Sequence, residues 1–426
     1  MFHSFQTVSI IGLGYIGLPT AAVIASQKIN VIGVDVNKDV VDTINLGKIH
    51  IVEPDLDVRV HTAVDEGYLR ATIIPEPSDA FLIAVPTPFK SGARGDHEPD
   101  LRYIEAASKS IAKVLKKGDL VVLESTSPVG ATEQMALWLA YARPDLTFPQ
   151  THGEDSDIRV AYCPERVLPG HVLAELVNND RVIGGMTPKC SKVAAYLYKI
   201  FVRGECIITN ARTAEMCKLT ENSFRDVNIA FANELSMICE ELNIDVWELI
   251  SLANRHPRVN ILNPGPGVGG HCIAVDPWFI VDSAPDSSDL IRTARNVNDG
   301  KPEWVLAQVA KAVELAQSRH GREVVIACLG LTFKADIDDL RESPSLEIVE
   351  QIAARSMGGK LLVVEPYVNS MPPRLVKYSH LELVDLEYAL SEAEVILLLV
   401  DHALFKSIDR SSFGDKILID TRGVWR

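Results

Sequence analysis

Apolar positions in the first part of the chain fall into short, strand-length runs separated by segments with helical spacing. The first run leads into a glycine cluster, an amphipathic helical stretch continues to about Ser26, and a second run ends at Asp35. This order is typical of a βαβ unit of about 30 residues. A further helix is expected over Leu101–Leu115. The runs expected to form strands are Thr7–Ile11, Val31–Val34, Ala80–Val85, Leu120–Glu124 and Arg159–Tyr162, the last of which should close the first domain.

The middle of the chain has a different pattern, with apolar residues three and four positions apart. From Thr187 to Leu252 the spacing is mostly helical, and Thr213–Leu242 contains neither Gly nor Pro. It predicts one central helix of about 40 Å. A glycine-rich loop, Asn263–Cys272, and a helical segment, Leu290–Ser318, come next. Strand-length runs then return at Val324–Leu329, Leu361–Glu365, Val395–Val400 and Ile417–Asp420.

This succession predicts an α/β protein with two α/β halves around a helical middle. Strands that alternate with helices favour parallel sheets covered by helices on both faces. The halves share one feature, because each opens with an apolar strand that runs into a glycine, at Gly12 and at Gly330. The polar stretch Phe89–Asp100 is expected to be a surface loop.

Composition and charge narrow the class of protein. The 426 residues are 47% hydrophobic and 23% charged, which suits two or three globular domains. A net charge of −15 argues against nucleic acid or an anionic membrane surface as the partner. An anionic substrate would therefore need a locally basic site.

Compartment signals point to the cytoplasm. The seven cysteines include no CxxC pair, which indicates reduced thiols and no zinc site, and no metal is expected. The segment after Met1 lacks the pattern of a secretory signal. No apolar run reaches the roughly 18 residues of a membrane span.

The glycine cluster Gly12-Leu13-Gly14-Tyr15-Ile16-Gly17 has the spacing G-x-G-x-x-G between a predicted strand and a predicted helix. In that context the glycines allow a tight turn, close approach to a pyrophosphate and close helix packing, and the helix N-terminus favours phosphate. Asp35, about 20 residues on, suits a ribose 2′-hydroxyl and would repel a 2′-phosphate. The cluster therefore predicts NAD rather than NADP, the alternative being a turn that only packs the sheet.

Cys272 follows a loop rich in Gly and Pro, which allows backbone to approach a ligand closely. A thiolate there could add to an aldehyde, and the thiohemiacetal could lose a second hydride to give a hydrolysable thioester. The alternative is an inert buried cysteine. The other cysteines, such as Cys217 and Cys239, are expected in the core.

Basic side chains gather in three further places. Lys218, Asn222 and Arg225 share one face of the predicted central helix, where a desolvated lysine could act as an acid or base. The alternative is a solvated face with a Glu221–Arg225 pair. The clusters Arg255-His256-Pro257-Arg258 and Gly330-Leu331-Thr332-Phe333-Lys334 suit phosphate or carboxylate, although the first could also be an exposed basic turn.

Six motifs in order resemble the UDP-glucose/GDP-mannose dehydrogenase family over nearly the whole chain, from Gly12 to Arg422. They are Glu124-Ser125-Thr126-Ser127-Pro128-Val129-Gly130, Tyr162-Cys163-Pro164-Glu165-Arg166-Val167, the Lys218 helix, Asn254-Arg255-His256-Pro257-Arg258, the Cys272 loop and Leu340-Arg341-Glu342-Ser343-Pro344. The resemblance implies two Rossmann-like parallel-sheet domains joined by a long central helix and a helical dimerisation region. The expected domains are 1–210 for NAD, 211–318 for the central helix, dimerisation region and Cys loop, and 319–426 for the UDP-sugar.

The resemblance also implies a role for individual residues. The catalytic residues it implies are Cys272 as nucleophile, Lys218 as acid/base, Asn222 at the C6 oxygen, Asp276 and Thr126 orienting water, and Glu165 assisting proton transfer. The residues it implies for NAD are Gly12, Gly14, Tyr15, Ile16, Gly17, Asp35, Thr87, Thr126 and Arg341. Those it implies for the UDP-sugar are Arg166, Val167, Lys218, Asn222, Arg225, Gly269, Phe333, Lys334 and Arg422, with His256 and Arg258 reaching in from the partner of a homodimer.

The expected reaction is the four-electron, NAD-dependent oxidation of the C6 hydroxymethyl group of a UDP-sugar to the uronate. The resemblance favours N-acetylmannosamine as the sugar and synthesis of an enterobacterial-type surface antigen as the purpose. UDP-glucose, UDP-N-acetylgalactosamine and UDP-N-acetylglucosamine remain alternatives. A two-electron dehydrogenase for another sugar or hydroxyacid, or a catalytically silent NAD-binding protein, are competing classes. The loop Lys90–Asp96 is longer than the resemblance leads us to expect and is given no role.

Overall fold

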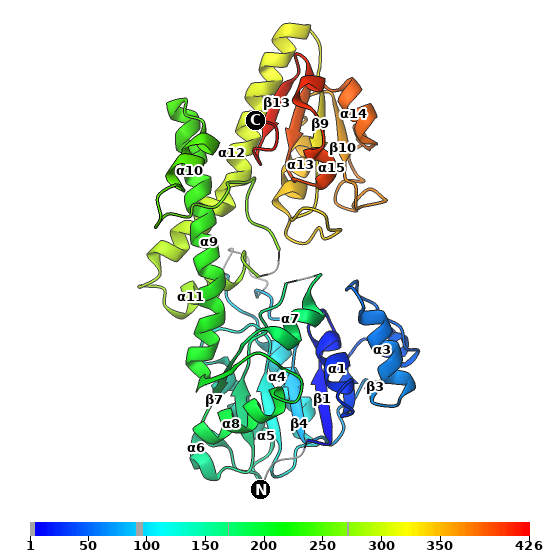
Figure 1. Cartoon of the computed structure of the whole chain (residues 1–426), viewed down its shortest axis with the longest axis vertical. Coiled ribbons are helices and arrows are strands. Elements are labelled where there is room, and N and C mark those ends of the chain that lie inside the picture. Colours follow the sequence, from blue (N-terminus) through cyan, green and yellow to red (C-terminus); the bar gives the residue numbers. More distant parts are fainter. Residues whose placement is uncertain (1–4, 91–96, 169, 271) are drawn as a thin grey trace. The chain divides into compact units, whose positions relative to one another are not determined.

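The computed structural model describes residues 5–90, 97–168, 170–270 and 272–426. The chain divides into two compact units, residues 1–221 with 282–284 and residues 222–281 with 285–426. Figure 1 shows a sheet flanked by helices in each of them. The loop Lys90–Asp96 lies outside the described residues apart from Lys90, whose amide donates a hydrogen bond to the carbonyl of Glu98.

The first unit is built on an eight-stranded sheet within the described residues, in the order β3-β2-β1-β4-β5-β6-β7-β8. All neighbouring strands are parallel except β6 and β7. The order reverses between β1 and β4, which is where an open α/β sheet holds its ligand. The strands are β1 (Thr7–Ile11), β2 (Asn30–Val34), β3 (Leu69–Thr72), β4 (Ala80–Ile83), β5 (Leu120–Leu123), β6 (Arg159–Tyr162), β7 (Arg181–Gly185) and β8 (Cys206–Asn210).

Alternate residues of these strands pack on opposite faces of the sheet. Ile10 belongs to the apolar cluster that contains α1 and α7, whereas Ile11 belongs to the cluster that contains α4 and α5. Burial on both faces explains why β4 and β5 are apolar throughout. The helices of this unit are α1 (Gly17–Ala25), α2 (Lys38–Asn45), α3 (Leu56–Asp65), α4 (Arg102–Ala112), α5 (Ala131–Ala142), α6 (Pro149–His152), α7 (Val172–Asn178) and α8 (Pro188–Tyr198).

Two expectations for this unit are wrong. Helix α1 is not amphipathic, because all nine of its residues are buried between the sheet and helices α3 and α7. The strand Arg159–Tyr162 does not close the domain, since β7 and β8 extend the sheet beyond it. The stretch Thr187–Leu252 is mostly helical, as expected, although it also contains β8, an edge strand whose side chains are largely exposed.

A long helix, α9 (Ala211–Leu242), carries the chain from the first unit into the second, as Figure 1 shows. Its 32 residues correspond to a length of about 48 Å, somewhat more than expected. The second long helix, α12, has 32 residues and contains Pro302, which is buried. The other helices before the second sheet are α10 (Val246–Ala253) and α11 (Asp276–Ser283), and α12 spans Asp289–His320.

The second unit contains a five-stranded parallel sheet within the described residues, in the order β11-β10-β9-β12-β13. It repeats the inner order of the first sheet, because β10-β9-β12 corresponds to β2-β1-β4. Strand β11 was not predicted, since it has only three residues. The elements are β9 (Val325–Leu329), α13 (Pro344–Ala354), β10 (Lys360–Val364), β11 (Leu381–Leu383), α14 (Leu386–Glu392), β12 (Val395–Leu398), α15 (Ala403–Lys406) and β13 (Ile417–Asp420).

Candidate active site

The glycine turn after β1 lies at the point where the first sheet reverses its order. Gly12 has a φ of +93°, and a Cβ on it would lie 2.6 Å from the carbonyl oxygen of Ala84. A Cβ on Gly17 would lie 1.8 Å from the carbonyl oxygen of Gly12, whereas one on Gly14 would meet nothing within 4 Å. The outer glycines are thus required by packing. The middle one leaves open space in front of helix α1, which fits the approach of a pyrophosphate.

Asp35 is fixed beside this turn. Its carboxylate accepts hydrogen bonds from the amide of Leu13 at 3.0 Å and from the amide of Asn37 at 2.9 Å. Lys38, the nearest lysine in sequence, pairs with Asp42. His50 also lies near Asp35, but burial lowers the pKa of His50, which favours the uncharged ring. The residues fit the ribose of NAD and offer no cation for a 2′-phosphate. His50 was not singled out from the sequence, because nothing in the pattern links it to Asp35.

Replacing Asp35 with asparagine should weaken NAD binding about tenfold, because one of the two oxygens becomes an amide group that cannot accept a hydrogen bond. Titration of NAD by calorimetry measures the effect. Asp39→Asn in the first turn of α2 is the matched control and should bind NAD as the parent does. Equal affinity in Asp35→Asn and the control would contradict the assignment.

The ends of β4 and β5 bring two predicted threonines together. The hydroxyl of Thr87 donates a hydrogen bond to the carbonyl oxygen of Thr126. Ser125 strengthens the link, because its hydroxyl donates to the carbonyl of Val85 at 2.7 Å. Both threonines therefore lie at the carboxyl edge of the sheet, next to the glycine turn.

A buried ion pair lies at the end of β6. Arg181 and Glu165 are joined at 2.5 Å, with both side chains almost fully buried. The amide of Arg166 donates to the second carboxylate oxygen of Glu165 at 2.7 Å. Next to the pair, Glu124 accepts a hydrogen bond from the hydroxyl of Tyr198, and burial raises the pKa of Glu124 to about 7. Arg181, Glu124 and Tyr198 were not predicted, since only the fold brings them to Glu165.

Helix α9 buries two of its three predicted site residues. Lys218 and Asn222 are each 8% exposed, whereas Arg225 is exposed. Glu221 pairs with Arg166 at 2.7 Å, and not with Arg225 as a solvated polar face would have it. The buried lysine and amide lie one helical turn apart, an arrangement that can hold and protonate an oxygen.

Cys272 is joined to this amide through the start of α11. The side-chain amide of Asn222 donates a hydrogen bond to the carboxylate of Asp276. The backbone amide of Asp276 in turn donates to the backbone carbonyl of Cys272 at 2.9 Å. All seven cysteines lie in the described part of the chain, and Cys272 is the exposed one among them. Cys239 is buried as expected, whereas Cys217 is half-buried. His271 of the predicted motif lies outside the described residues.

The loop before Cys272 packs against the predicted UDP-sugar residues of the second unit. A Cβ on Gly269 would lie 2.8 Å from Cβ of Phe333, and one on Gly265 would lie 2.7 Å from the guanidinium of Arg422. Asn233 of α9 fixes the loop, because its side-chain oxygen accepts from the amide of Gly265 at 2.8 Å. The structure thus brings Gly269, Phe333 and Arg422 together.

Four further predicted residues lie in exposed positions, and a fifth is half-buried. Lys334 is exposed after β9, and Arg341 pairs with Asp339 at 2.5 Å. His256 and Arg258 lie in an exposed turn after α10, and Val167 is half-buried. Among the residues that the structure describes, no group of three His, Cys, Asp or Glu could hold a metal ion. The helices described there include none long and apolar enough to cross a membrane.

Three models of the UDP-glucose/GDP-mannose dehydrogenase family match the chain: the NAD binding domain over residues 6–202, the central domain over 212–300 and the UDP binding domain over 327–426. An NDP-N-acetyl-D-galactosaminuronic acid dehydrogenase of Ralstonia nicotianae is 65% identical over 99% of this chain and 96% of the relative. A UDP-N-acetyl-D-mannosamine dehydrogenase of Yersinia pestis is also 65% identical, over 99% of this chain and 100% of the relative. A solved UDP-D-ManNAc dehydrogenase from Pyrococcus horikoshii matches with a TM-score of 0.84 and 38% identity, covering 99% of this chain and 96% of that chain.

Proposed function

The chain belongs to the UDP-glucose/GDP-mannose dehydrogenase family, and on that premise we propose that it oxidises the C6 hydroxymethyl group of UDP-N-acetyl-D-mannosamine to a carboxylate. The observation that carries the proposal is the exposed Cys272, linked through Asp276 to the buried amide of Asn222. Bound NAD⁺ would accept one hydride in each of two oxidations. The residues of this chain must therefore bind the UDP-sugar, take the proton from its C6 hydroxyl and promote hydrolysis of the thioester.

In the first oxidation Lys218 takes the proton from the C6 hydroxyl as the alcohol becomes an aldehyde, while Asn222 holds the oxygen. The sulfur of Cys272 then forms a bond to C6, and the carbonyl oxygen gains a proton to give a thiohemiacetal. Loss of a second hydride and of the hydroxyl proton gives a thioester. Two NADH and one carboxylate are formed for each sugar.

In the hydrolytic half, water adds to the thioester carbon and the carbon–sulfur bond breaks, which returns the thiol. Asp276 and Thr126 orient the water, and Glu165 assists the proton transfer. Burial of Asp276 and of the Glu165–Arg181 pair supports these roles, because both carboxylates are held in fixed positions by hydrogen bonds.

We assign the nucleotide-sugar to the remaining cations and to the glycine loop. Arg166, Arg225, Lys334 and Arg422 neutralise the diphosphate and hold the sugar, with Val167, Gly269 and Phe333 in contact with the ligand. Focused cations of this kind can attract an anion to a protein whose net charge is −15. On the cofactor side, Tyr15, Ile16, Thr87, Thr126 and Arg341 add to the glycine turn and Asp35. We further propose that the reaction takes place in the cytoplasm, where the uronate would serve synthesis of an enterobacterial-type surface antigen.

A panel of nucleotide sugars tests the substrate, with NADH formation by purified protein as the readout. UDP-N-acetyl-D-mannosamine should give two NADH per sugar and the highest kcat/KM. The N-acetylgalactosamine sugar is the second candidate, because the Ralstonia relative is as similar as the Yersinia one. Highest activity on UDP-N-acetylgalactosamine would show that this sugar, and not UDP-N-acetyl-D-mannosamine, is the substrate. Formation of one NADH per sugar would contradict the four-electron reaction.

The chain is further proposed to work as a homodimer through helix α9. Phe224, Phe231 and Ile238 are exposed at seven-residue spacing, which places them on one face of the helix, and Leu242 continues the stripe. Phe224 is 69% exposed. An apolar stripe of this kind is typical of a helix that packs against a partner.

Replacing Phe231 with glutamate should therefore shift the protein to monomers at micromolar concentration, because a charge in an apolar interface is costly. Sedimentation equilibrium measures the change. Tyr141→Glu in α5, where the aromatic side chain is 90% exposed, is the control and should leave the oligomeric state unaltered. A Phe231→Glu protein that sediments as the parent does would exclude this face as the interface.

Mixing two inactive variants tests whether His256 and Arg258 act on the partner's site. Arg258→Ala chains keep Cys272, and Cys272→Ser chains keep Arg258, so a mixed dimer contains one complete site if the arginine acts in trans. Activity should appear only after the two proteins are unfolded and refolded together. No recovery, while the parent refolds to full activity, would place the arginine in its own subunit's site.

A further inference from the structure

The same glycine turn follows the central strand of each sheet, β1 in the first and β9 in the second. The two turns differ in the surroundings of the carboxylate that each of them binds. Gly330 has a φ of +97° and its amide donates to the carbonyl of Val364 at 2.9 Å, as the amide of Gly12 does to Val34 at 2.8 Å. Leu331 donates its amide to the carboxylate of Glu365 at 2.7 Å, which matches the bond from Leu13 to Asp35. Glu365 is therefore the counterpart of Asp35.

Glu365, however, is not available to a ribose. Its carboxylate accepts from the amides of Leu331, Thr332 and Tyr367 and contacts the ring of His402 at 3.2 Å. Burial would raise the pKa of Glu365, but the hydrogen bonds from His402 and Leu331 outweigh burial and lower it. The ionised carboxylate thus serves as an internal hydrogen-bond acceptor that ties the turn after β9 to His402. His402 follows β12 by four residues, the position that Thr87 has after β4.

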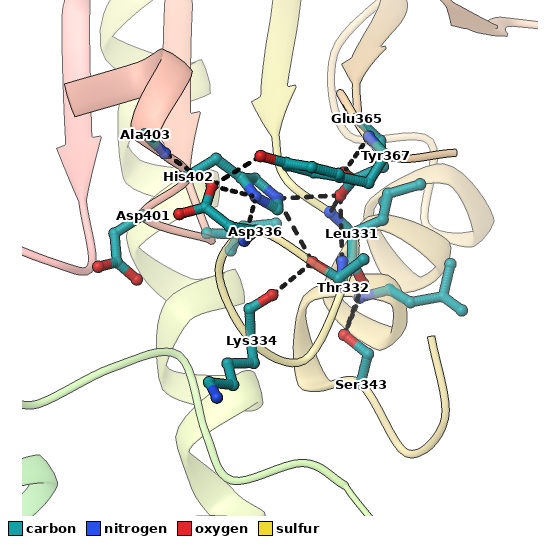
Figure 2. A network of polar contacts seen from close by, with 12 residues as sticks. Leu331, Thr332, Lys334, Asp336, Ser343, Glu365, Tyr367, Asp401, His402 and Ala403 are labelled. Carbon is teal, nitrogen blue, oxygen red and sulfur yellow. Dashed lines mark hydrogen bonds and ion pairs between the residues drawn. The ribbon is translucent and has the colours of Figure 1, made fainter. Parts of the chain in front are cut away.

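The contacts of His402 determine which ring nitrogen carries the proton. Nδ1 accepts from the amide of Asp336 at 2.9 Å, so this nitrogen has no hydrogen. Nε2 must then be the donor, to Glu365 and to the hydroxyl of Thr332 at 3.3 Å. The Thr332 hydroxyl in turn donates to the carbonyl of Lys334 at 2.9 Å. Figure 2 shows this chain of contacts around the ring.

These contacts hold the loop on both sides of Lys334. Thr332 is held through Nε2 and Asp336 through Nδ1, while the carboxylate of Asp336 accepts from the amide of Ala403 at 2.9 Å. The side chain of Lys334 extends away from the network in Figure 2, and the residue is exposed. A loop fixed at both ends would present its ammonium group to an anion with little loss of conformational entropy.

We propose that His402 is a positioning residue for the diphosphate of the substrate, because its neutral ring holds the Thr332–Asp336 loop so that Lys334 points at the phosphates. The proposal rests on the assignment of Lys334 to the nucleotide-sugar. Glu365 and Thr332 are both buried and complete this set of hydrogen bonds around the ring.

The test is the affinity of the full-length protein for UDP, with steady-state kinetics beside it. His402→Phe fills the space but makes no hydrogen bond, and should raise the Kd of UDP and the KM of the UDP-sugar about tenfold while kcat changes by less than about twofold. His402→Asn can still accept from Asp336 and should recover part of the loss. NAD affinity should not change, and His320→Phe, at the exposed end of α12, is the control.

Lys334→Met separates failure of this inference from failure of its premise. If Lys334→Met weakens UDP binding and neither His402 variant does, the positioning role is wrong and the assignment of Lys334 stands. If Lys334→Met binds UDP as tightly as the parent, the premise itself is wrong. In the Lys334→Met background, His402→Phe should add less than about twofold, since residues that act as a unit are not additive. A further tenfold loss there would overturn the proposal.

Discussion

Replacing Cys272 with serine should lower NADH formation at least about 10³-fold, as the loss of a covalent nucleophile does in other enzymes. A serine hydroxyl is a far weaker nucleophile than a thiolate and does not support the thioester route. Any residual turnover should stop at the aldehyde and yield one NADH per sugar. Stopped-flow absorbance at the NADH band, with mass analysis of the sugar product, measures both effects.

Cys206→Ser is the matched control, because Cys206 is half-buried at the edge strand β8 and has no proposed role. It should leave kcat within about twofold of the parent. Alkylation gives an independent check. Iodoacetamide should modify the exposed Cys272 first, while the buried Cys163, Cys190 and Cys328 should resist. A fully active Cys272→Ser protein would refute the covalent mechanism and favour the two-electron dehydrogenase.

Much of the fold could be predicted because the relevant signals are local. A buried parallel strand is typically a continuous apolar run, and β4, β5, β9 and β12 all have this pattern. The resemblance to the family was confirmed by three family models in the expected order. The glycine turn and Asp35 were also predictable, since their spacing is set by one βαβ unit.

The elements that were missed lack such a local signal. Strand β7 contains two glycines and pairs antiparallel with β6, and β11 has only three residues. Helix α1 is buried on all sides, which no periodicity can reveal before the packing is known. Arg181 and His402 were missed for a related reason. Their partners Glu165 and Glu365 are distant in sequence and become neighbours only when the strands align.

Arg181 leads to the second large effect. Replacing it with methionine should destabilise the first unit by about 3–5 kcal/mol, because the carboxylate of Glu165 would remain buried without its partner. The variant also loses the bond from Arg181 to the carbonyl of Leu176 at 3.0 Å. Hydrogen exchange of peptides from β6 and β7 measures the local free energy of opening, which avoids treating the two units as one cooperative transition. Unchanged protection would contradict a stabilising role for the pair.

The loss of stability in Arg181→Met should be larger at high pH than at low pH. Because burial raises the pKa of Glu124 from 4.5 to about 7, the folded chain holds a proton that the unfolded chain releases, and stability falls as pH rises through this window. Arg181 opposes that rise, so its removal should raise the pKa of Glu124 further. The pH range over which stability falls then extends to higher pH, and the variant should be less stable at pH 8 than at pH 5.5. Arg181→Met combined with Glu165→Gln should recover most of the stability, since no charge is left without its partner. If Glu165 also moves a proton during hydrolysis, the double variant will be stable and yet inactive, whereas a carboxylate with only a structural role would leave it both stable and active.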